Sequence, residues 1–248
     1  MMSSYLTYDD ILKKSEQLNA SYELDISIFE DIVDELLNSE KDTDTVVLEG
    51  FERLLGSVDR TMGDIDTFLD MKPNCFMGCA FCCYFPIRVS KMEAKLFFRS
   101  IEHMSPERKE NIFQHWEAYY DKFSRKIDTA LEIDPDDPDM KLKYKKLNLP
   151  CPMLDEENQL CMAYEVRPVP CRTYVNYSDP TVCATEHMPK ETFSYDFLYN
   201  FYFQSMNELL QALYENGEEL PVDYPMDAWN YDYLPGWIQK YRQGEMVT

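Results

Sequence analysis

Four of the chain's eight cysteines lie within nine consecutive residues, in the stretch CFMGCAFCC at 75–83. Cysteine thiolates are ligands for zinc and for iron–sulfur clusters, and they also serve as nucleophiles and redox groups. Cys79 and Cys82 have the C-x-x-C spacing that lets two thiolates on one tight turn reach the same metal. Gly78 beside them allows the backbone to bend closely around such a site. The stretch therefore predicts a metal site built on a turn.

Cys82 and Cys83 are adjacent, so in extended backbone their side chains point to opposite sides. Either the chain turns sharply there, or two neighbouring sites share the stretch. A single buried cysteine is usually an inert apolar side chain, but this explanation does not suit a set of eight. The predicted metal ligands are Cys75, Cys79, Cys82, Cys83, Cys151, Cys161, Cys171 and Cys183. We expect the two groups of cysteines to meet in one metal region.

The chain has only three histidines, so the predicted site is almost purely sulfur. His103 and His115 lie in predicted helices as ordinary residues, and His187 is a weak extra candidate ligand near Cys183. Such a site favours zinc or an iron–sulfur cluster over magnesium, calcium or manganese. Eight thiols exceed what one structural zinc needs, which favours an iron–sulfur cluster of the [4Fe-4S] type. Two zinc sites would use the same eight cysteines equally well.

Basic side chains near the cysteines could offset the negative charge of metal-bound thiolates. Arg167 and Arg172, close to Cys171, are the predicted cofactor-binding residues; the alternative is that both form ordinary salt bridges with the abundant acids. The basic run KLKYKK at 141–146 precedes Cys151, and its pattern favours a solvated face over an anion-binding role.

The formal net charge of −22 argues against a nucleic-acid partner, since phosphate binding depends on clustered lysine and arginine. The N-terminal sequence predicts neither a secretory signal nor a membrane anchor, and no run reaches the roughly 18 apolar residues of a membrane helix. We therefore expect a cytoplasmic protein, where clustered cysteines more often bind metal than form disulfides. The predicted partners are a metal ion or cluster and a protein that suits the acidic surface.

The hydrophobic pattern predicts a mainly α fold with a short β-hairpin, irregular metal-centred loops, and helical N- and C-terminal extensions. Apolar stripes at helical spacing occupy residues 11–18, 28–37, 47–69, 96–101, 112–127 and 193–213. Helix starts are indicated by Thr7, by the capping box of Ser90 and Glu93, and by Ser105 before Pro106.

Turn signals and composition suggest where these elements end and how the chain divides. The run DPDDPD at 134–139 ends one helix, Gly217 closes another, and the segment CPMLDEENQLCMAY at 151–164 predicts the hairpin. The predicted units are a helical N-terminal segment (1–70), a cysteine-cluster metal-binding domain (71–190), and an aromatic helix with a wrapping tail (191–248).

CFMGCAFCC, together with CPMLDEENQLCMAYEVRPVPCRTY at 151–174, resembles the cysteine-cluster (CxxCxxCC, YkgJ-like) family of zinc- or iron-chelating domains. The resemblance covers about residues 71–185. It departs from the family pattern in one place, where three residues rather than two separate Cys75 from Cys79. The matching positions are Cys75, Cys79, Cys82, Cys83, Cys151, Pro152, Leu154, Cys161, Tyr164, Arg167, Pro168, Cys171 and Arg172.

The resemblance implies metal chelation, and the flagellin lysine N-methylases, as distant relatives, give methyl transfer some family support. The predicted function is therefore metal chelation through the clustered cysteines, with the downstream role and any enzyme activity left open. The alternative is a SAM-dependent modifying enzyme, because Cys75, Cys79 and Cys82 have the spacing with which radical SAM enzymes hold a [4Fe-4S] cluster. Against it, that class typically uses an αβ barrel, and the segments after Cys83 are predicted as helices. A module whose metal only holds the fold is a third reading.

Overall fold

The computed structural model of the chain describes residues 5–246, and it is mainly helical, as the sequence predicts. Its helices are α1 (Tyr8–Ser21), α2 (Ser27–Leu37), α3 (Thr43–Leu69), α4 (Lys91–Glu102), α5 (Pro106–Leu131), α6 (Met140–Lys146), α7 (Val169–Thr173), α8 (Thr181–Thr185), α9 (Leu198–Glu215) and α10 (Leu234–Arg242), with 3₁₀ turns η1 (Phe81–Tyr84), η2 (Tyr164–Val166) and η3 (Met226–Trp229). Across residues 5–246, every helix lacks the combination of length and apolar composition that crossing a membrane requires.

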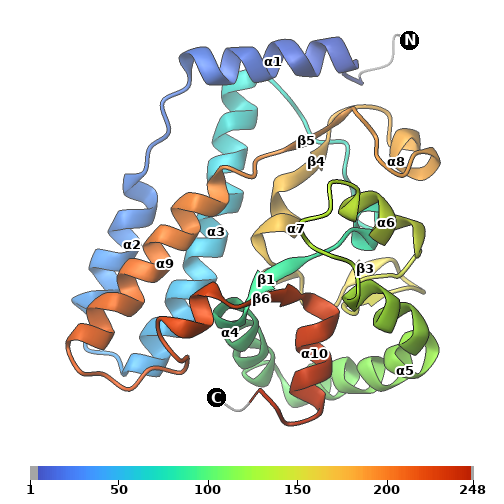
Figure 1. Cartoon of the computed structure of the whole chain (residues 1–248). Coiled ribbons are helices and arrows are strands. Elements are labelled where there is room, and N and C mark those ends of the chain that lie inside the picture. The colour runs from blue at the N-terminus through green and yellow to red at the C-terminus, as the bar shows by residue number, and fades with distance from the viewer. Residues whose placement is uncertain (1–4, 247–248) are drawn as a thin grey trace.

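The long helix α3 packs against α2 and α9, and the three form a bundle on one side of the molecule (Figure 1). Apolar side chains at helical spacing are buried between them, among them Phe29, Leu54 and Leu209. Gly50 lets α9 approach α3 closely, because a Cβ at this position would lie 2.4 Å from the Leu209 side chain. A helix near the C-terminus thus completes a bundle that the N-terminal helices begin.

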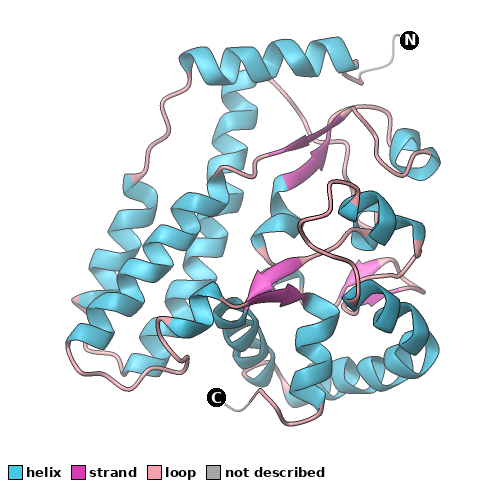
Figure 2. Cartoon of the chain, viewed as in Figure 1, coloured by secondary structure: helices cyan, strands magenta, loops and turns pink. Residues whose placement is uncertain are grey.

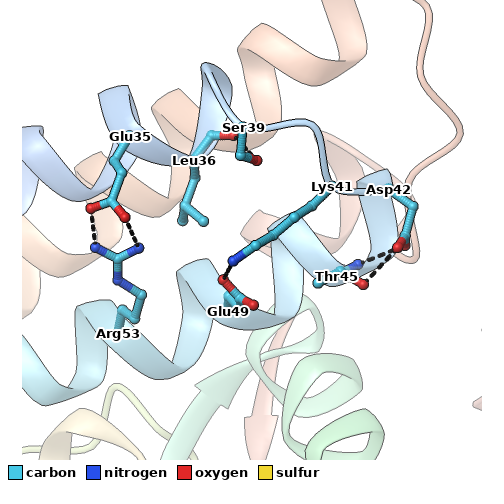
Figure 3. A network of polar contacts seen from close by, with 8 residues as sticks. All are labelled: Glu35, Leu36, Ser39, Lys41, Asp42, Thr45, Glu49 and Arg53. Carbon is cyan, nitrogen blue, oxygen red and sulfur yellow. Dashed lines mark hydrogen bonds and ion pairs between the residues drawn. The ribbon is translucent and has the colours of Figure 1, made fainter.

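Polar contacts fix the connection between α2 and α3 (Figure 3). Asp42 caps α3 by accepting a hydrogen bond of 3.0 Å from the backbone N–H of Thr45. Arg53 on α3 donates two hydrogen bonds to the carboxylate of Glu35 on α2, at 3.1 and 2.5 Å. Since that carboxylate is largely exposed, the pair adds little stability, and the buried apolar stripe holds the two helices together.

The other side of the molecule contains α4, α5 and α10 (Figure 1). The predicted capping box at the start of α4 is confirmed: the Ser90 hydroxyl accepts from the Glu93 N–H, and the Glu93 carboxylate accepts from the Ser90 N–H. Ser105 caps α5 and Pro106 occupies its first turn, also as predicted. The α10 helix is anchored by Trp237, whose indole N–H donates to the Val89 carbonyl at 3.0 Å.

Within residues 5–246, strands form three two-stranded antiparallel sheets (Figure 2). The predicted hairpin is confirmed as β2 (Leu154–Asp155) paired with β3 (Leu160–Cys161). The other two sheets join distant segments that sequence patterns did not reveal. They pair β1 (Arg88–Ser90) with β6 (Tyr231–Tyr233), and β4 (Tyr174–Asn176) with β5 (Thr192–Ser194).

The C-terminal part differs from the prediction in detail. The aromatic helix starts at Leu198 rather than near residue 193, because residues 192–194 are taken into the β4–β5 pair. The segment after α9 contains the unpredicted elements β6 and α10, which pair with β1 and pack against α4 and α5. The division of the chain at residues 70 and 190 stays a prediction.

Candidate metal centre

The first cysteine segment is a tight loop followed by the 3₁₀ turn η1. Gly78 has a φ of +89°, a left-handed conformation that strongly favours glycine, so the bend predicted here is present. Two hydrogen bonds close the loop, from the Cys79 N–H to the Phe76 carbonyl at 2.9 Å and from the Cys83 N–H to the Ala80 carbonyl at 3.0 Å. The loop gathers four thiols into a few turns of backbone, although it contains little apolar side-chain burial.

The other four cysteines come from separate elements that surround this loop. Cys151 precedes the hairpin and its N–H donates to the Cys83 carbonyl at 2.6 Å. Cys161 lies in β3 opposite Leu154, where the hairpin fixes its position. Cys171 lies in α7 and Cys183 in α8. The described structure therefore brings all eight cysteines, which span more than a hundred residues of sequence, into one region.

An outer group consists of Cys75, Cys79, Cys82 and Cys183, which line the same small hollow. Cys75 is exposed, and its sulfur accepts a hydrogen bond of 3.5 Å from the Asn176 N–H. The Cys75 thiol donates to Cys79, which lowers the pKa of Cys79 to about 6 and raises that of Cys75. Cys79 is thus readily deprotonated, and the thiolate is the form that binds metal.

An inner group consists of Cys83, Cys151, Cys161 and Cys171, whose pKa values are all raised. Burial is the largest cause for the last three, and the pKa of Cys151 reaches about 12. Cys171 interacts electrostatically with both Cys151 and Cys161, so these thiols are neighbours. Without a metal ion these groups favour the protonated form, and metal binding would have to displace their protons.

Cys82 and Cys83 connect the two groups. The Cys83 thiol donates to Cys82, which lowers the pKa of Cys82 and raises that of Cys83. Cys82 also interacts electrostatically with Cys75 in the outer group and with Cys151 in the inner group. The adjacent pair lies in the 3₁₀ turn η1, and its two thiols interact with different groups of cysteines.

A buried lysine from the basic run lies beside this pair. Lys145 on α6 is 9% exposed, and its ammonium group donates a hydrogen bond of 2.6 Å to the Phe81 carbonyl. The same group lies 4.2 Å from the centre of the Phe85 ring. Lys141, Lys143 and Lys146 are exposed, so the prediction of a solvated face describes this run except at Lys145.

The two predicted cofactor-binding arginines occupy different positions. Arg172 is buried and pairs with Asp59 on α3, and its Nε donates to the Arg167 carbonyl at 2.8 Å. Arg167 lies 3.4 Å from Asp59 and stacks over the Tyr164 ring. Burial raises the pKa of Cys161 and of Cys171, and the charge of Arg167 offsets part of that rise. Both arginines form salt bridges, and Arg167 also acts on the inner thiols; a cofactor-binding role stays a prediction.

Among residues 5–246, no histidine lines the hollow that the outer cysteines share. His103 and His187 are exposed. His115 is half-buried beside Pro152, and burial lowers its pKa. Among residues 5–246, no three histidine, cysteine, aspartate or glutamate side chains already stand around a common point as a metal site. The cysteine thiols lie in one region, but they are not arranged around a common point as metal ligands would be.

Residues 74–193 match the family described as "CxxCxxCC: Putative zinc- or iron-chelating domain". This segment is a CxxCxxCC domain. It contains all eight cysteines, and it confirms the resemblance inferred from CFMGCAFCC and the downstream motif. Neither the curated proteins nor the solved structures gave a significant match.

The CxxCxxCC domain also contains site residues that sequence reasoning missed. Tyr174 and Asn176 line the outer hollow with the four outer cysteines, and both lie on β4, just after Cys171. Pairing of β4 with a strand beyond the last cysteine was not predicted, so nothing placed them there. Lys145 was missed because a run of lysines suggested solvent, and its burial depends on how α6 packs against η1.

Proposed function

We propose that the chain binds metal in two adjacent four-thiolate sites, the outer one formed by Cys75, Cys79, Cys82 and Cys183 and the inner one by Cys83, Cys151, Cys161 and Cys171. The observation that carries this proposal is the position of Cys82 and Cys83, which interact with each other and with thiols of both groups. Two adjacent residues in a 3₁₀ turn can supply one ligand each to sites on either side.

We propose further that the metal is iron, held as iron–sulfur clusters of the [4Fe-4S] type. Support comes from the donor set, because each group offers four thiols, and a [4Fe-4S] cluster takes four cysteine ligands. Zinc sites often include histidine, and no histidine of residues 5–246 lines the hollow that the outer cysteines share. When bound, such a cluster would supply one-electron transfer or a structural cross-link between the segments that carry the cysteines.

The test is anaerobic purification followed by absorption spectroscopy and measurement of iron, zinc and acid-labile sulfide. We expect broad absorption near 400 nm with iron and sulfide in matching amounts. A colourless protein that retains zinc through the same cysteines would overturn the iron proposal and leave the two-site arrangement standing. Double serine variants, described in the Discussion, test that arrangement separately.

In a radical SAM enzyme, one iron of the [4Fe-4S] cluster has no cysteine ligand and binds SAM instead. In the outer group Cys183 lines the same hollow as Cys75, Cys79 and Cys82, so a fourth thiol is at hand. The mainly helical fold, with only two-stranded sheets within residues 5–246, also differs from the barrel typical of that class. We therefore favour closed sites over an open catalytic cluster.

A further inference from the structure

Two lysines in the described part of the chain have buried side chains, and they are satisfied in different ways. Lys95 on α4 pairs with the carboxylate of Asp227 at 2.8 Å, and the side chains are 8% and 3% exposed. Lys145 on α6 is buried to a similar degree, but it forms no ion pair with a carboxylate of residues 5–246. The cationic group of Lys145 therefore lacks the partner that the protein provides for Lys95.

Burying a charge without a counter-charge is costly, because water no longer solvates it. The hydrogen bond to the Phe81 carbonyl and the contact with the Phe85 ring offset only part of that cost. The remaining groups that act on Lys145 are cysteines from both proposed sites, Cys82 and Cys183 of the outer group and Cys83 of the inner group. As neutral thiols they provide no counter-charge, whereas as metal-bound thiolates they do.

We propose that Lys145 is a positioning residue that compensates the negative charge of the metal–thiolate centre, an inference that rests on the proposed function. Four thiolates around a [4Fe-4S]²⁺ core, or around Zn²⁺, leave a net charge of about −2 at each site, by counting one charge for each thiolate. An ammonium group at the junction of the two sites reduces this charge for both. It also orders the loop, because its hydrogen bond reaches the residue that precedes Cys82.

The space around Lys145 allows a conservative replacement to be tested. A second small hollow adjoins the first, and it is lined by Lys145 together with Phe85, Tyr174, Cys183 and Pro189. The larger guanidinium group of arginine could extend into this hollow and keep the positive charge. Lys146 is exposed on the same helix, so its replacement removes the same charge from a solvated position.

The experiment compares the wild-type protein with Lys145→Met, Lys145→Arg and the control Lys146→Met. Each protein is reconstituted anaerobically with ferrous iron and sulfide, and then challenged with EDTA. We expect Lys145→Met to lose metal about 10- to 100-fold faster, the range typical of residues that support metal ligands. We also expect its midpoint potential to fall, because reduction adds negative charge that is no longer offset. Lys145→Arg should restore both properties, and Lys146→Met should match the wild type.

Unfolding of the metal-free proteins separates this role from a purely structural one. If Lys145 only supported the fold, Lys145→Met would lower the stability of the metal-free form and leave the potential unchanged. We expect instead that Lys145→Met raises the stability of the metal-free form and shifts the midpoint potential, since methionine removes an unpaired buried charge from that form. Equal metal retention and equal potential in Lys145→Met and the wild type would overturn the inference. If the wild type binds zinc alone, the iron proposal is overturned, and the role of Lys145 is then tested by comparing how well the wild type and Lys145→Met retain zinc against EDTA. If the wild type binds no metal, both proposals are overturned.

Discussion

The backbone N–H of Cys151 donates a hydrogen bond of 2.6 Å to the carbonyl oxygen of Cys83. This bond joins the compact first cysteine loop to the second set of cysteines through main-chain atoms, independently of any metal. It places Cys151 next to the adjacent pair from which the two proposed sites diverge. The proposed division into an outer and an inner site can be tested by replacing two cysteines of the same site, or of different sites, together.

Serine replacements should reveal which cysteines share a site. Cys75→Ser and Cys183→Ser both remove ligands of the proposed outer site, so the double variant should lose little more metal than either single one. Cys183→Ser combined with Cys161→Ser removes ligands of both sites, and its losses should add. Iron and zinc content, measured by mass spectrometry of the purified proteins, is the readout. Non-additive losses in both double variants would indicate a single shared centre.

Metal removal should loosen the cysteine loops and leave the α2–α3–α9 bundle folded. Within residues 74–86, Ala80 is the buried apolar residue, so metal binding must supply much of the order there. The bundle instead has a well-buried apolar core of its own, including Leu54 and Leu209. Hydrogen exchange after chelation should accelerate in residues 74–86 and 178–192, with α3 protected. Identical exchange before and after chelation would show that the loops do not depend on metal.

Arg172→Ala should destabilise the fold by about 2–4 kcal/mol, because it removes a buried cation that bonds to a carboxylate and to main-chain carbonyls. Arg172 joins α7 to α3 through Asp59, and its Nε donates to the Arg167 carbonyl. The free energy of unfolding in urea is the measurement. Arg53→Ala is the matched control: it breaks the largely exposed pair with Glu35 and should cost no more than about 1 kcal/mol.

Asp227 should make stability depend on pH in the acidic range. Burial raises the pKa of Asp227, but hydrogen bonds from Lys95, the Asp223 N–H and Lys91 outweigh this, so the folded pKa lies below its ordinary value near 3.8. Because the folded pKa is lowered, the contribution of ionised Asp227 to the free energy of unfolding is complete above the unfolded pKa. It is lost as pH falls through the folded pKa. Asp227→Asn should therefore cost about 2–4 kcal/mol at pH 7, and markedly less at pH 3.

Urea unfolding of the wild type and Asp227→Asn at pH 7, 5 and 3 checks this expectation. Lys91, which is 28% exposed, serves for comparison, because Lys91→Met should cost less than Lys95→Met, whose side chain is 8% exposed. A difference in the free energy of unfolding between wild type and Asp227→Asn that stays constant down to pH 3 would contradict the expected pH dependence.

SAM should leave the proposed clusters unchanged. If four cysteines ligate each cluster, the amino and carboxylate groups of SAM have no free iron to bind. The electron paramagnetic resonance spectrum of the reduced protein should then be the same with and without SAM, and Cys183→Ser should be the variant that first allows a change. Release of 5′-deoxyadenosine from the wild type on reduction would instead support the radical SAM reading.

Local patterns predicted the helices well because short-range physics determines them. The capping box of Ser90 and Glu93, Pro106 in the first turn of α5, and the apolar stripe of α3 each depend on residues within a few positions of one another. The β2–β3 hairpin also joins neighbours in sequence, so its turn signal was sufficient. The β1–β6 and β4–β5 pairs were missed, because strands of three residues carry almost no periodic signal and their partners lie far away.

The candidate site was predictable in composition but not in arrangement. The identity of the eight cysteines is written in the sequence, and the C-x-x-C spacing with Gly78 correctly indicated a turn. Their grouping depends on how α7, α8 and the hairpin surround the first loop, which is tertiary information. Lys145 was missed for the same reason, since one lysine among four in a basic run becomes buried only when α6 packs against η1.

The pairing of β1 with β6 has a consequence for how the protein is made. Strand β1 begins only five residues after Cys83, while its partner β6 is synthesised after all eight cysteines. The α2–α3 pair likewise waits for α9 before its apolar face is covered. A nascent chain that has already exposed all eight cysteines therefore still lacks both closures. Metal that the thiols bound during this interval would be enclosed once α9 packs against α2 and α3 and β6 pairs with β1.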